Sequence, residues 1–417
     1  MNIEDFRIIC VMGWGISGVS LCGLLLSLKK KVKISEVRER NCFESSLIDE
    51  FTKRGVEFEF GGHSRDFIKD SRLVVLSPGV DTFNSLVSKY VKEFEILCVG
   101  EIELCSWLTK AKIIALTGTN GKTTTSYLTH RVLQESKERV FLGGNIGTPF
   151  SSFVLNTNEN SLVVLELSSF QLETIFEFRP YAAALLNIEP DHLDRYADLK
   201  DYLKAKMNIF KNQQVCDWAL LNKNIAFRAD IEKSIKSQIV YFSQEFSNEN
   251  LSCIARIAAI FGLNKDVCLK VFSEFKGLPH RLQVISKLKG VTFINDSKAT
   301  NPSSTIWALK NIKAPVILIA GGKDKGLDYS CLSPYSGCLK KINLIGQAAF
   351  KIKEALGSNM EAGLEIFSSL EGAVKASFEE ACQGDTVLLS PMCASFDMFT
   401  DYKQRGCRFM EIVNTLK

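Results

Sequence analysis

The feature that most constrains this chain is the regular alternation of short apolar runs, rich in β-branched residues, with longer helical stretches. A run from Phe6 to Met12 is followed by a glycine turn, the apolar helical stretch Val19–Leu28 and a second short run at Lys31–Ser35. Strands that alternate with helices build parallel sheets covered by helices. The sequence therefore predicts an α/β fold, and a chain of 417 residues has room for about two to four domains.

Two breaks in this alternation predict three domains in series. The first break falls near Thr109-Lys110 and the second at Gly277-Leu278-Pro279. We therefore expect domains at residues 1–109, 110–277 and 278–417. The outer two are expected to be Rossmann-like, and the central one to contain the parallel sheet of a P-loop ATPase.

Composition argues against several classes of protein. Lys and Arg number 51 and Asp and Glu 47, so a net charge of +4 spread over the chain predicts no nucleic-acid partner. There is no apolar run of membrane-spanning length and no signal-peptide pattern at the N-terminus, so we expect a cytoplasmic protein without a membrane span. The thirteen cysteines are then expected to be free thiols, with neither a disulfide framework nor a structural zinc site.

A first glycine loop, Gly13-Trp14-Gly15-Ile16-Ser17-Gly18, follows the first predicted strand and opens a helix. The free N–H groups of a helix N-terminus bind phosphates, and Glu36 lies near the spacing of a ribose-binding acid. The pattern fits an NAD-dependent dehydrogenase or the diphosphate of another nucleotide. A tight turn without a ligand is the remaining interpretation.

A second loop lies at the start of the predicted central domain, between the strand Lys112–Leu116 and an amphipathic helix. It departs from the strict phosphate-loop pattern because Leu116 stands where the first glycine is expected, but Gly-Lys-Thr is present. Its backbone N–H groups would surround phosphates, Lys122 would reach the β- and γ-phosphates, and the Thr123 hydroxyl would bind Mg²⁺. The predicted ATP contacts are Gly118, Thr119, Asn120, Gly121, Lys122, Thr123 and Thr124.

Two polar side chains follow other predicted buried strands of the same domain. Glu166 ends one strand, and His192 follows another together with Asp191 and Asp194. A carboxylate at the end of an apolar strand is costly to bury unless it is paired or binds a metal. Oxygen ligands with one imidazole suit Mg²⁺ or Mn²⁺. For His192 alone, a hydrogen-bonded, partly buried imidazole is the alternative.

Ordered motifs across nearly the whole chain resemble those of the Mur ligases of peptidoglycan synthesis. The resemblance is carried by residues 118–123, 143–147, 166–171, 191–195, 278–281, 295–301 and 389–397. The last three segments are most similar to the branch of the family whose amino-acid substrate is D-glutamate. The resemblance implies a monomeric ligase whose substrates are UDP-N-acetylmuramoyl-L-alanine, D-glutamate and ATP.

The same resemblance assigns roles to residues by matched position. Asn145 contacts the reacting carboxyl region, and Lys206 is a lysine that CO₂ carbamylates so that, with Thr123, Glu166 and His192, it binds metal. Without the resemblance, Lys206 would be interpreted as a solvated helix lysine. The remaining assignments are Ile16, Ser17, Arg38, Ser77, Pro78 and Gly79 to the UDP end, Asn250, Arg281 and Asp296 to ATP, and Lys298, Thr300, Lys325, Ser395 and Tyr402 to D-glutamate.

Three positions depart from the family pattern. Tyr402 and Met392 stand where Phe and Ala are usual, and the sequence around Asn250 is less rich in alanine.

The expected reaction is attack of the L-alanyl carboxylate on the γ-phosphate of ATP, which gives an acyl phosphate that the amine of D-glutamate then attacks. The sequence leaves the base for this amine open, with Asp191 or a second substrate group as candidates.

Three alternatives remain at this level. Folylpolyglutamate synthase also joins glutamate through an acyl phosphate, but its loop continues Gly-Lys-Gly-Ser where this chain has Thr123-Thr124 after Lys122. The diaminopimelate-adding Mur ligase carries an Asp-Asn-Pro-Arg signature that this chain lacks. The third is a dehydrogenase whose central loop serves only as a nucleotide switch or scaffold.

Overall fold

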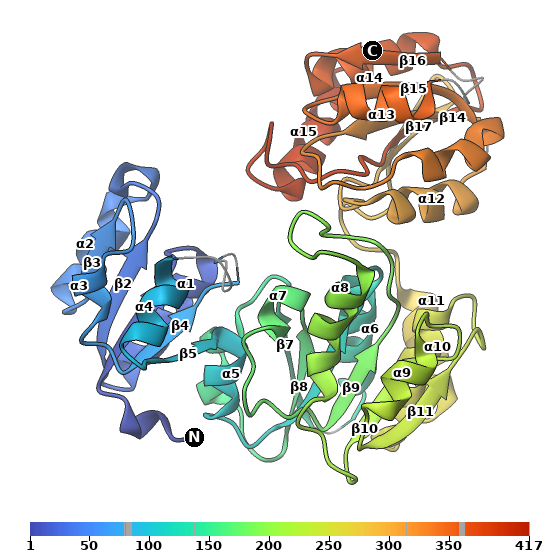
Figure 1. Cartoon of the computed structure of the whole chain (residues 1–417). Helices are drawn as coiled ribbons and strands as arrows, with labels where there is room; N and C mark the ends of the chain where they lie inside the picture. The colour runs from blue at the N-terminus through green and yellow to red at the C-terminus, as the bar shows by residue number, and fades with distance from the viewer. Residues whose placement is uncertain (79, 81–85, 137, 314, 358–362, 417) are drawn as a thin grey trace. The chain divides into compact units, whose positions relative to one another are not determined.

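The computed structural model describes residues 1–78, 80, 86–136, 138–313, 315–357 and 363–416. The chain forms two compact units, and Figure 1 shows that each is built from sheets flanked by helices. The first unit comprises Met1–Ile188 and Leu203–Glu274, and the second comprises Glu189–Tyr202 and Phe275–Lys417. The predicted α/β class is confirmed.

The first sheet of the first unit has five strands, all parallel, in the order β3-β2-β1-β4-β5. Its central strands are apolar runs that are buried almost throughout, as expected for a parallel sheet covered on both faces. The strands are β1 Ile8–Met12, β2 Lys31–Glu36, β3 Glu57–Phe60, β4 Leu73–Leu76 and β5 Leu97–Gly100. The helices are η1 Ile3–Asp5, α1 Ile16–Ser27, η2 Arg40–Cys42, α2 Ser45–Lys53, α3 Arg65–Ile68, α4 Leu86–Glu93 and α5 Glu101–Ser106.

The second sheet of the same unit has six parallel strands in the order β11-β10-β9-β6-β8-β7. The strands are β6 Lys112–Thr117, β7 Arg139–Gly144, β8 Ser161–Glu166, β9 Ala182–Leu185, β10 Trp218–Asn222 and β11 Gln238–Phe242. The helices are α6 Lys122–Leu133, η3 Phe150–Ser152, η4 Val154–Asn156, α7 Ser169–Leu172, α8 Leu199–Met207, η5 Asn208–Phe210, α9 Arg228–Lys233, α10 Glu249–Ile260 and α11 Lys265–Glu274. Because the strands are parallel, the loops after them emerge at one edge, where α/β proteins bind ligands.

Helix α5 links these two sheets through buried carboxylates. The Glu103 carboxylate accepts hydrogen bonds from the backbone N–H groups of Phe176, Glu177 and Phe178 at 2.7–2.9 Å, and from the indole of Trp107 at 2.8 Å. Two residues earlier, Glu101 accepts hydrogen bonds from the N–H and hydroxyl of Ser151 at 2.9 and 2.7 Å. A buried carboxylate is tolerated where several donors satisfy it, so these contacts fix α5 against the central sheet.

The second unit contains a six-stranded sheet in the order β12-β13-β17-β14-β15-β16. The strands are β12 Gln283–Leu288, β13 Val291–Asn295, β14 Val316–Gly321, β15 Leu339–Ile345, β16 Gly363–Phe367 and β17 Thr386–Leu389. The helices are α12 Pro302–Asn311, η6 Ser330–Cys338, α13 Ala349–Leu356, α14 Leu370–Glu380 and α15 Tyr402–Thr415.

This sheet is mixed, which modifies the prediction of a Rossmann-like domain. Strand β12 runs antiparallel to β13, whereas the other pairs are parallel. The two strands are joined by Lys289 and Gly290, which both have positive φ. Two consecutive residues of this kind form the tight turn that matches the twist of a hairpin.

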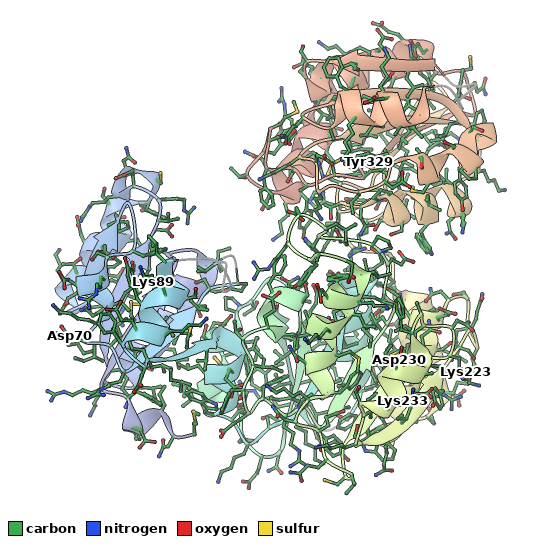
Figure 2. All side chains as sticks on the ribbon, in the orientation of Figure 1. Asp70, Lys89, Lys223, Asp230, Lys233 and Tyr329 are labelled. Atoms are coloured by element: carbon green, nitrogen blue, oxygen red, sulfur yellow. The ribbon has the colours of Figure 1, made fainter. Side chains whose placement is uncertain are left out.

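The core of the second unit has two layers, one on each face of the sheet. Alternate residues of β14 face opposite sides: Leu318 packs with α12 and α13, while Ile317 packs with α14 and α15. Figure 2 places Tyr329 inside this unit, and its side chain is almost completely buried. The continuous apolar run Val316–Ala320 is therefore explained by burial on both faces.

Among the helices described, none combines the length and apolar character that crossing a bilayer requires. The thirteen cysteines all lie in the described part of the chain, and each is a free thiol.

Candidate active site

The phosphate-loop segment Thr117–Thr124 joins β6 to α6 at the edge of the central sheet where the strands end. Gly121 precedes the helix with a positive φ of 79°, which a residue with a side chain rarely adopts. A side chain there would also clash with the amide nitrogen of Asn250. The structure thus places Asn250, a predicted ATP contact, directly against this loop.

Asn187 is not among the residues predicted from the sequence, and it fixes the conformation of this loop. Its side-chain oxygen accepts hydrogen bonds from the N–H groups of Thr119 and Asn120 at 3.0 and 2.8 Å, and its amide donates to the Asn120 carbonyl at 3.0 Å. Lys122 donates to the carbonyls of Gly118 and Thr119, both at 2.8 Å. The available signal was an asparagine two residues after the apolar strand β9.

Glu166 lies beside this loop because of strand register. In the pairing of β6 with β8, Leu116 is opposite Glu166. The Glu166 side chain is 1 % exposed, and one carboxylate oxygen accepts a hydrogen bond from the Asn145 amide at 2.8 Å. The other oxygen, also buried, has no hydrogen-bond partner among the described residues.

This arrangement is compatible with a bound cation. A buried carboxylate oxygen without a donor is costly, and a divalent cation is a partner that removes the cost. The Gly143-Gly144-Asn145 motif supports the site, because a side chain at Gly144 would clash with the Glu166 carbonyl. The described residues nevertheless contain no group of three His, Cys, Asp or Glu side chains that could hold a metal ion, so further ligands would have to come from other groups.

Lys206 is buried, which contradicts its interpretation as a solvated helix lysine. Its side chain is 1 % exposed, and its ammonium group donates to the Gly118 carbonyl at 2.8 Å and approaches the Thr117 hydroxyl at 3.5 Å. Lys206 lies near the end of α8, and this helix brings its ammonium group into contact with the phosphate loop.

His192 belongs to the second unit, in the segment Glu189–Tyr202. It has a positive φ of 54°, and its ring nitrogen lies 3.8 Å from the carboxylate of Asp191. Asp191 is buried, forms an ion pair with Lys325 at 3.0 Å and accepts a hydrogen bond from Asn301 at 3.1 Å. Burial alone would raise the pKa of Asp191, but Lys325, His192 and Asn301 lower it to about 2, which makes this carboxylate a weak base.

The remaining predicted glutamate contacts lie in loops of the second unit and at the start of its helix α15. The Lys298 ammonium lies 5.0 Å from the centre of the Tyr402 ring, at the start of α15. Ser395 is buried and Thr300 is partly exposed. Met392, one of the departures from the family pattern, packs into the hydrophobic cluster of the third sheet.

Arg405, another residue missed at the sequence level, ties these loops together. It is 1 % exposed and donates to the hydroxyl and carbonyl of Ser297 at 3.0 and 2.8 Å, and to the carbonyls of Cys393 and Ala394 at 3.2 and 3.3 Å. Burial lowers the pKa of Arg405 to about 10. The arginine therefore fixes the two loops that carry Lys298 and Ser395 to helix α15.

Asp296 and Arg281, predicted to contact ATP, also belong to the second unit. Asp296 is buried and accepts hydrogen bonds from the Ser390 hydroxyl at 2.9 Å and from the Leu282 N–H at 3.2 Å. Burial raises the pKa of Asp296 from its ordinary value of 3.8 to about 6, although both hydrogen bonds and Arg281 act in the opposite direction.

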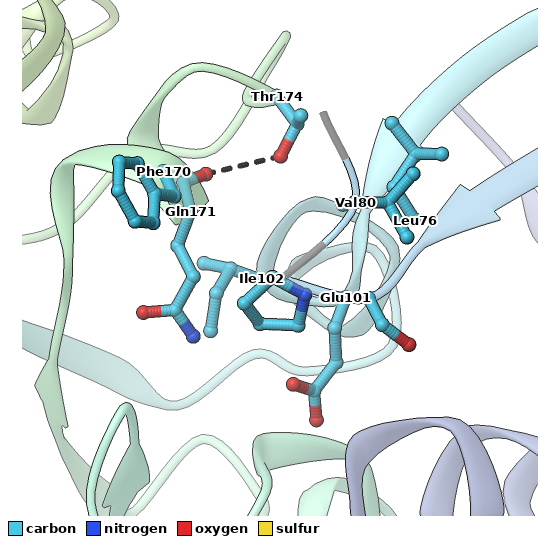
Figure 3. Close-up of a pocket in the computed structure, with 10 residues that line it drawn as sticks. Leu76, Val80, Glu101, Ile102, Phe170, Gln171 and Thr174 are labelled. Carbon is cyan, nitrogen blue, oxygen red and sulfur yellow. Dashed lines mark hydrogen bonds between the residues drawn. The ribbon is translucent and has the colours of Figure 1, made fainter. Parts of the chain in front are cut away.

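The first glycine loop places the predicted UDP contacts at the edge of the N-terminal sheet. Ile16 starts α1 and is 77 % exposed, and Ser17 beside it is partly buried. Ser77 and Pro78 line a pocket with Glu101, Gln171 and Thr174, shown in Figure 3. Gly79 lies outside the described residues.

Glu36 does not present a free carboxylate for a ribose. It is 3 % exposed and accepts hydrogen bonds from the Trp14 N–H at 2.7 Å and from the N–H and guanidinium of Arg38 at 3.0–3.1 Å. Although burial would raise it, the pKa of Glu36 is lowered by these partners. The Glu36 carboxylate thus links the glycine loop, through the N–H of Trp14, to Arg38.

Domain families known from other proteins match most of the chain. Residues 7–100 match the MurD-like N-terminal domain of Mur ligases, residues 116–284 the Mur ligase middle domain, and residues 280–393 the glutamate ligase domain of Mur ligases. The chain belongs to the Mur ligase family.

Two relatives that match this chain over its full length carry the same enzyme name. The chain is 37% identical to the UDP-N-acetylmuramoylalanine--D-glutamate ligase of Thermoanaerobacter pseudethanolicus, and 33% identical to the enzyme of that name from Clostridioides difficile. In both cases the match covers 100% of each chain.

Solved structures share the fold at lower identity. UDP-N-acetylmuramate-alanine ligase MurC from Thermotoga maritima matches with a TM-score of 0.62 and 18% identity, over 99% of this chain and 100% of that one. MurF from Acinetobacter baumannii gives 0.63 and 16%, over 91% and 90%. The fold is therefore the three-domain α/β fold of these ligases.

Asp296 should make stability depend on pH. At about pH 4–6 an unfolded aspartate has lost the proton that Asp296 retains in the folded chain, so the free energy of unfolding falls by roughly 3 kcal/mol as the pH rises through this window. Asp296→Asn should not show this decline. Urea unfolding of both proteins between about pH 4 and 7 measures it, and parallel profiles would show that Asp296 retains no proton in the folded state.

Proposed function

We propose that the chain joins D-glutamate to UDP-N-acetylmuramoyl-L-alanine and converts ATP to ADP and phosphate, as a step of peptidoglycan precursor synthesis. The observation that carries this proposal is full-length identity of 33–37% to curated ligases of that name. The phosphate loop with Glu166, Asn145 and Asn250 around it supports it, because these groups suit a triphosphate with a cation.

The three binding tasks are divided along the chain. Residues 1–109 bind the UDP end through the α1 N-terminus, residues 110–277 bind ATP, and residues 278–417 bind the amino acid. The protein acts as a monomer, since each substrate has its own part of one chain.

The chemistry requires activation of a carboxylate, which is a poor acyl donor. The L-alanyl carboxylate attacks the γ-phosphate of ATP, and the bond to ADP breaks to give an acyl phosphate. The amine of D-glutamate then attacks the acyl carbon, phosphate leaves, and the amine loses a proton. Lys122 and the N-terminus of α6 hold the phosphates, and Asn145 orients the carboxyl group.

Thr123, Glu166, His192 and Lys206 are the residues that would hold Mg²⁺, or Mn²⁺ in its place. The buried Glu166 oxygen without a donor fits a cation, as do the oxygen and imidazole donors of the set. When bound, the ion supplies charge neutralisation at the transferring phosphoryl group.

Lys206 joins this set only after modification. Its buried ammonium contacts the Gly118 carbonyl, and an ammonium would repel the metal. Reaction of the neutral amine with CO₂ forms an N–C bond and releases a proton, which leaves a carbamate anion. The carbamate is a suitable oxygen ligand, so we assign Lys206 this role.

Removal of CO₂ tests the assignment. Wild-type enzyme kept in CO₂-free buffer should lose most of its activity and recover it when bicarbonate is added, because the carbamate re-forms. Lys206→Arg retains a cation that does not form a stable carbamate, so its activity should be low and independent of bicarbonate. Full activity of the wild type after exhaustive CO₂ removal would eliminate the carbamate.

Lys122→Ala tests the reaction as a whole. Loss of a charge-assisted contact to the transferring phosphates should lower kcat by about a hundredfold or more. The measurement is phosphate release that requires UDP-N-acetylmuramoyl-L-alanine, ATP and D-glutamate together, with L-glutamate as the control substrate. Near-normal synthesis by this variant would show that the loop is not the ATP site, and equal rates with L-glutamate would contradict the choice of substrate.

The dehydrogenase alternative is tested in the same samples by NADH absorbance. Because the Glu36 carboxylate is already bonded to Trp14 and Arg38, we expect no NADH turnover. E. coli FolC shares the fold with a TM-score of 0.57 and 15% identity, over 79% of this chain and 98% of that one.

A further inference from the structure

The buried ion pair of Asp191 with Lys325 lies among the residues proposed to bind glutamate. Asp191 is 5 % and Lys325 8 % exposed, and the ammonium lies 3.0 Å from the carboxylate. The second oxygen of Asp191 accepts a hydrogen bond from Asn301 at 3.1 Å. Asn301 begins helix α12 three residues after Lys298, so all these groups belong to the second unit.

Stability does not account for this pair. Removing two charges from water costs free energy that their attraction repays only in part, and apolar residues of similar size are often as stabilising. The pair also lies in the loops at the sheet edge rather than between packed helices. A ligand that uses both charges would account for it.

The charges match those of a dicarboxylic amino acid. Lys298 and Lys325 contribute two positive charges and Asp191 one negative charge, which leaves +1. Glutamate carries two carboxylates and one ammonium, which leaves −1. Each charge of the amino acid would therefore have a partner of opposite sign in this part of the chain.

We propose that Asp191 binds the ammonium group of the incoming amino acid, after a carboxylate of the same molecule has taken its place on Lys325. This inference rests on the proposed function and extends it, because it makes Asp191 the residue that distinguishes an amino acid from a dicarboxylate without an amine. Asp191 then fixes the position of the nitrogen that is to attack the acyl phosphate.

The test compares D-glutamate with glutarate, which has the same two carboxylates and no amine. Both are titrated by calorimetry into the protein saturated with UDP-N-acetylmuramoyl-L-alanine and a non-hydrolysable ATP analogue. Wild type should bind D-glutamate more tightly. Asp191→Asn should lower the D-glutamate affinity at least about tenfold, as expected for loss of a charge-assisted contact, and leave the glutarate affinity equal or higher.

Three further variants separate recognition from structure. Asp201→Asn neutralises an exposed carboxylate of the same segment and should retain the preference for D-glutamate. Asp191→Glu keeps the charge and should retain part of that preference, whereas Lys325→Met should weaken both ligands.

The inference is overturned if Asp191→Asn weakens D-glutamate and glutarate by the same factor, which a purely structural role would do, or if it changes neither. Failure of the wild type to bind D-glutamate or to release phosphate with it would overturn the proposed function instead, and this inference with it. The two failures are therefore distinguishable in one set of titrations.

Discussion

The parallel pairing of β6 with its neighbours is the constraint on which the rest of the site depends. Leu116 lies opposite Glu166 on one side, and Thr117 opposite Leu185 on the other. This register brings the phosphate loop, the Glu166 carboxylate and Asn187 to one sheet edge. A shift of one residue in β8 would turn Glu166 to the opposite face of the sheet, and the loop would lose the carboxylate beside it.

Burial then gives these polar groups their chemical character. Glu166 and Lys206 are each 1 % exposed, so every unsatisfied charge or lone pair in this region is costly. The Lys206 ammonium is satisfied by the Gly118 carbonyl, whereas one Glu166 oxygen lacks a donor among the described residues. The same holds in the second unit, where Arg405 is buried and hydrogen-bonded and Asp191 and Lys325 form a buried ion pair.

The sequence predicted the interior strands and the loops that follow them, because strands buried on both faces form continuous apolar runs. It missed β3, β5, β11, β12 and β16, which all lie at sheet edges. Glu57–Phe60, for example, alternates charged and aromatic residues, since an edge strand is only half covered. The hairpin turn at Lys289-Gly290 was also missed, because Gly290 is the only residue in it that is typical of such a turn.

The residues of the candidate site also divide into those that the sequence predicted and those that it missed. Lys122 and Glu166 belong to motifs, whereas Asn250 was assigned by matched position, and the structure brings these three to the phosphate loop. Asn187 and Arg405 act through contacts that are distant in sequence, and Lys206 resembles any helix lysine until α8 is packed. No local pattern could reveal these contacts, because they depend on which elements become neighbours.

Binding of Mn²⁺ measures the central claim most directly. Electron paramagnetic resonance of free Mn²⁺, titrated with protein and a non-hydrolysable ATP analogue, should show weaker metal binding in Glu166→Gln than in wild type. The glutamine preserves the shape of the side chain and an oxygen for Asn145, and it replaces the charged second oxygen with a neutral NH₂ group that cannot bind a cation. Equal Mn²⁺ affinity in the two proteins would contradict the account, because the buried oxygen of Glu166 would then hold no cation.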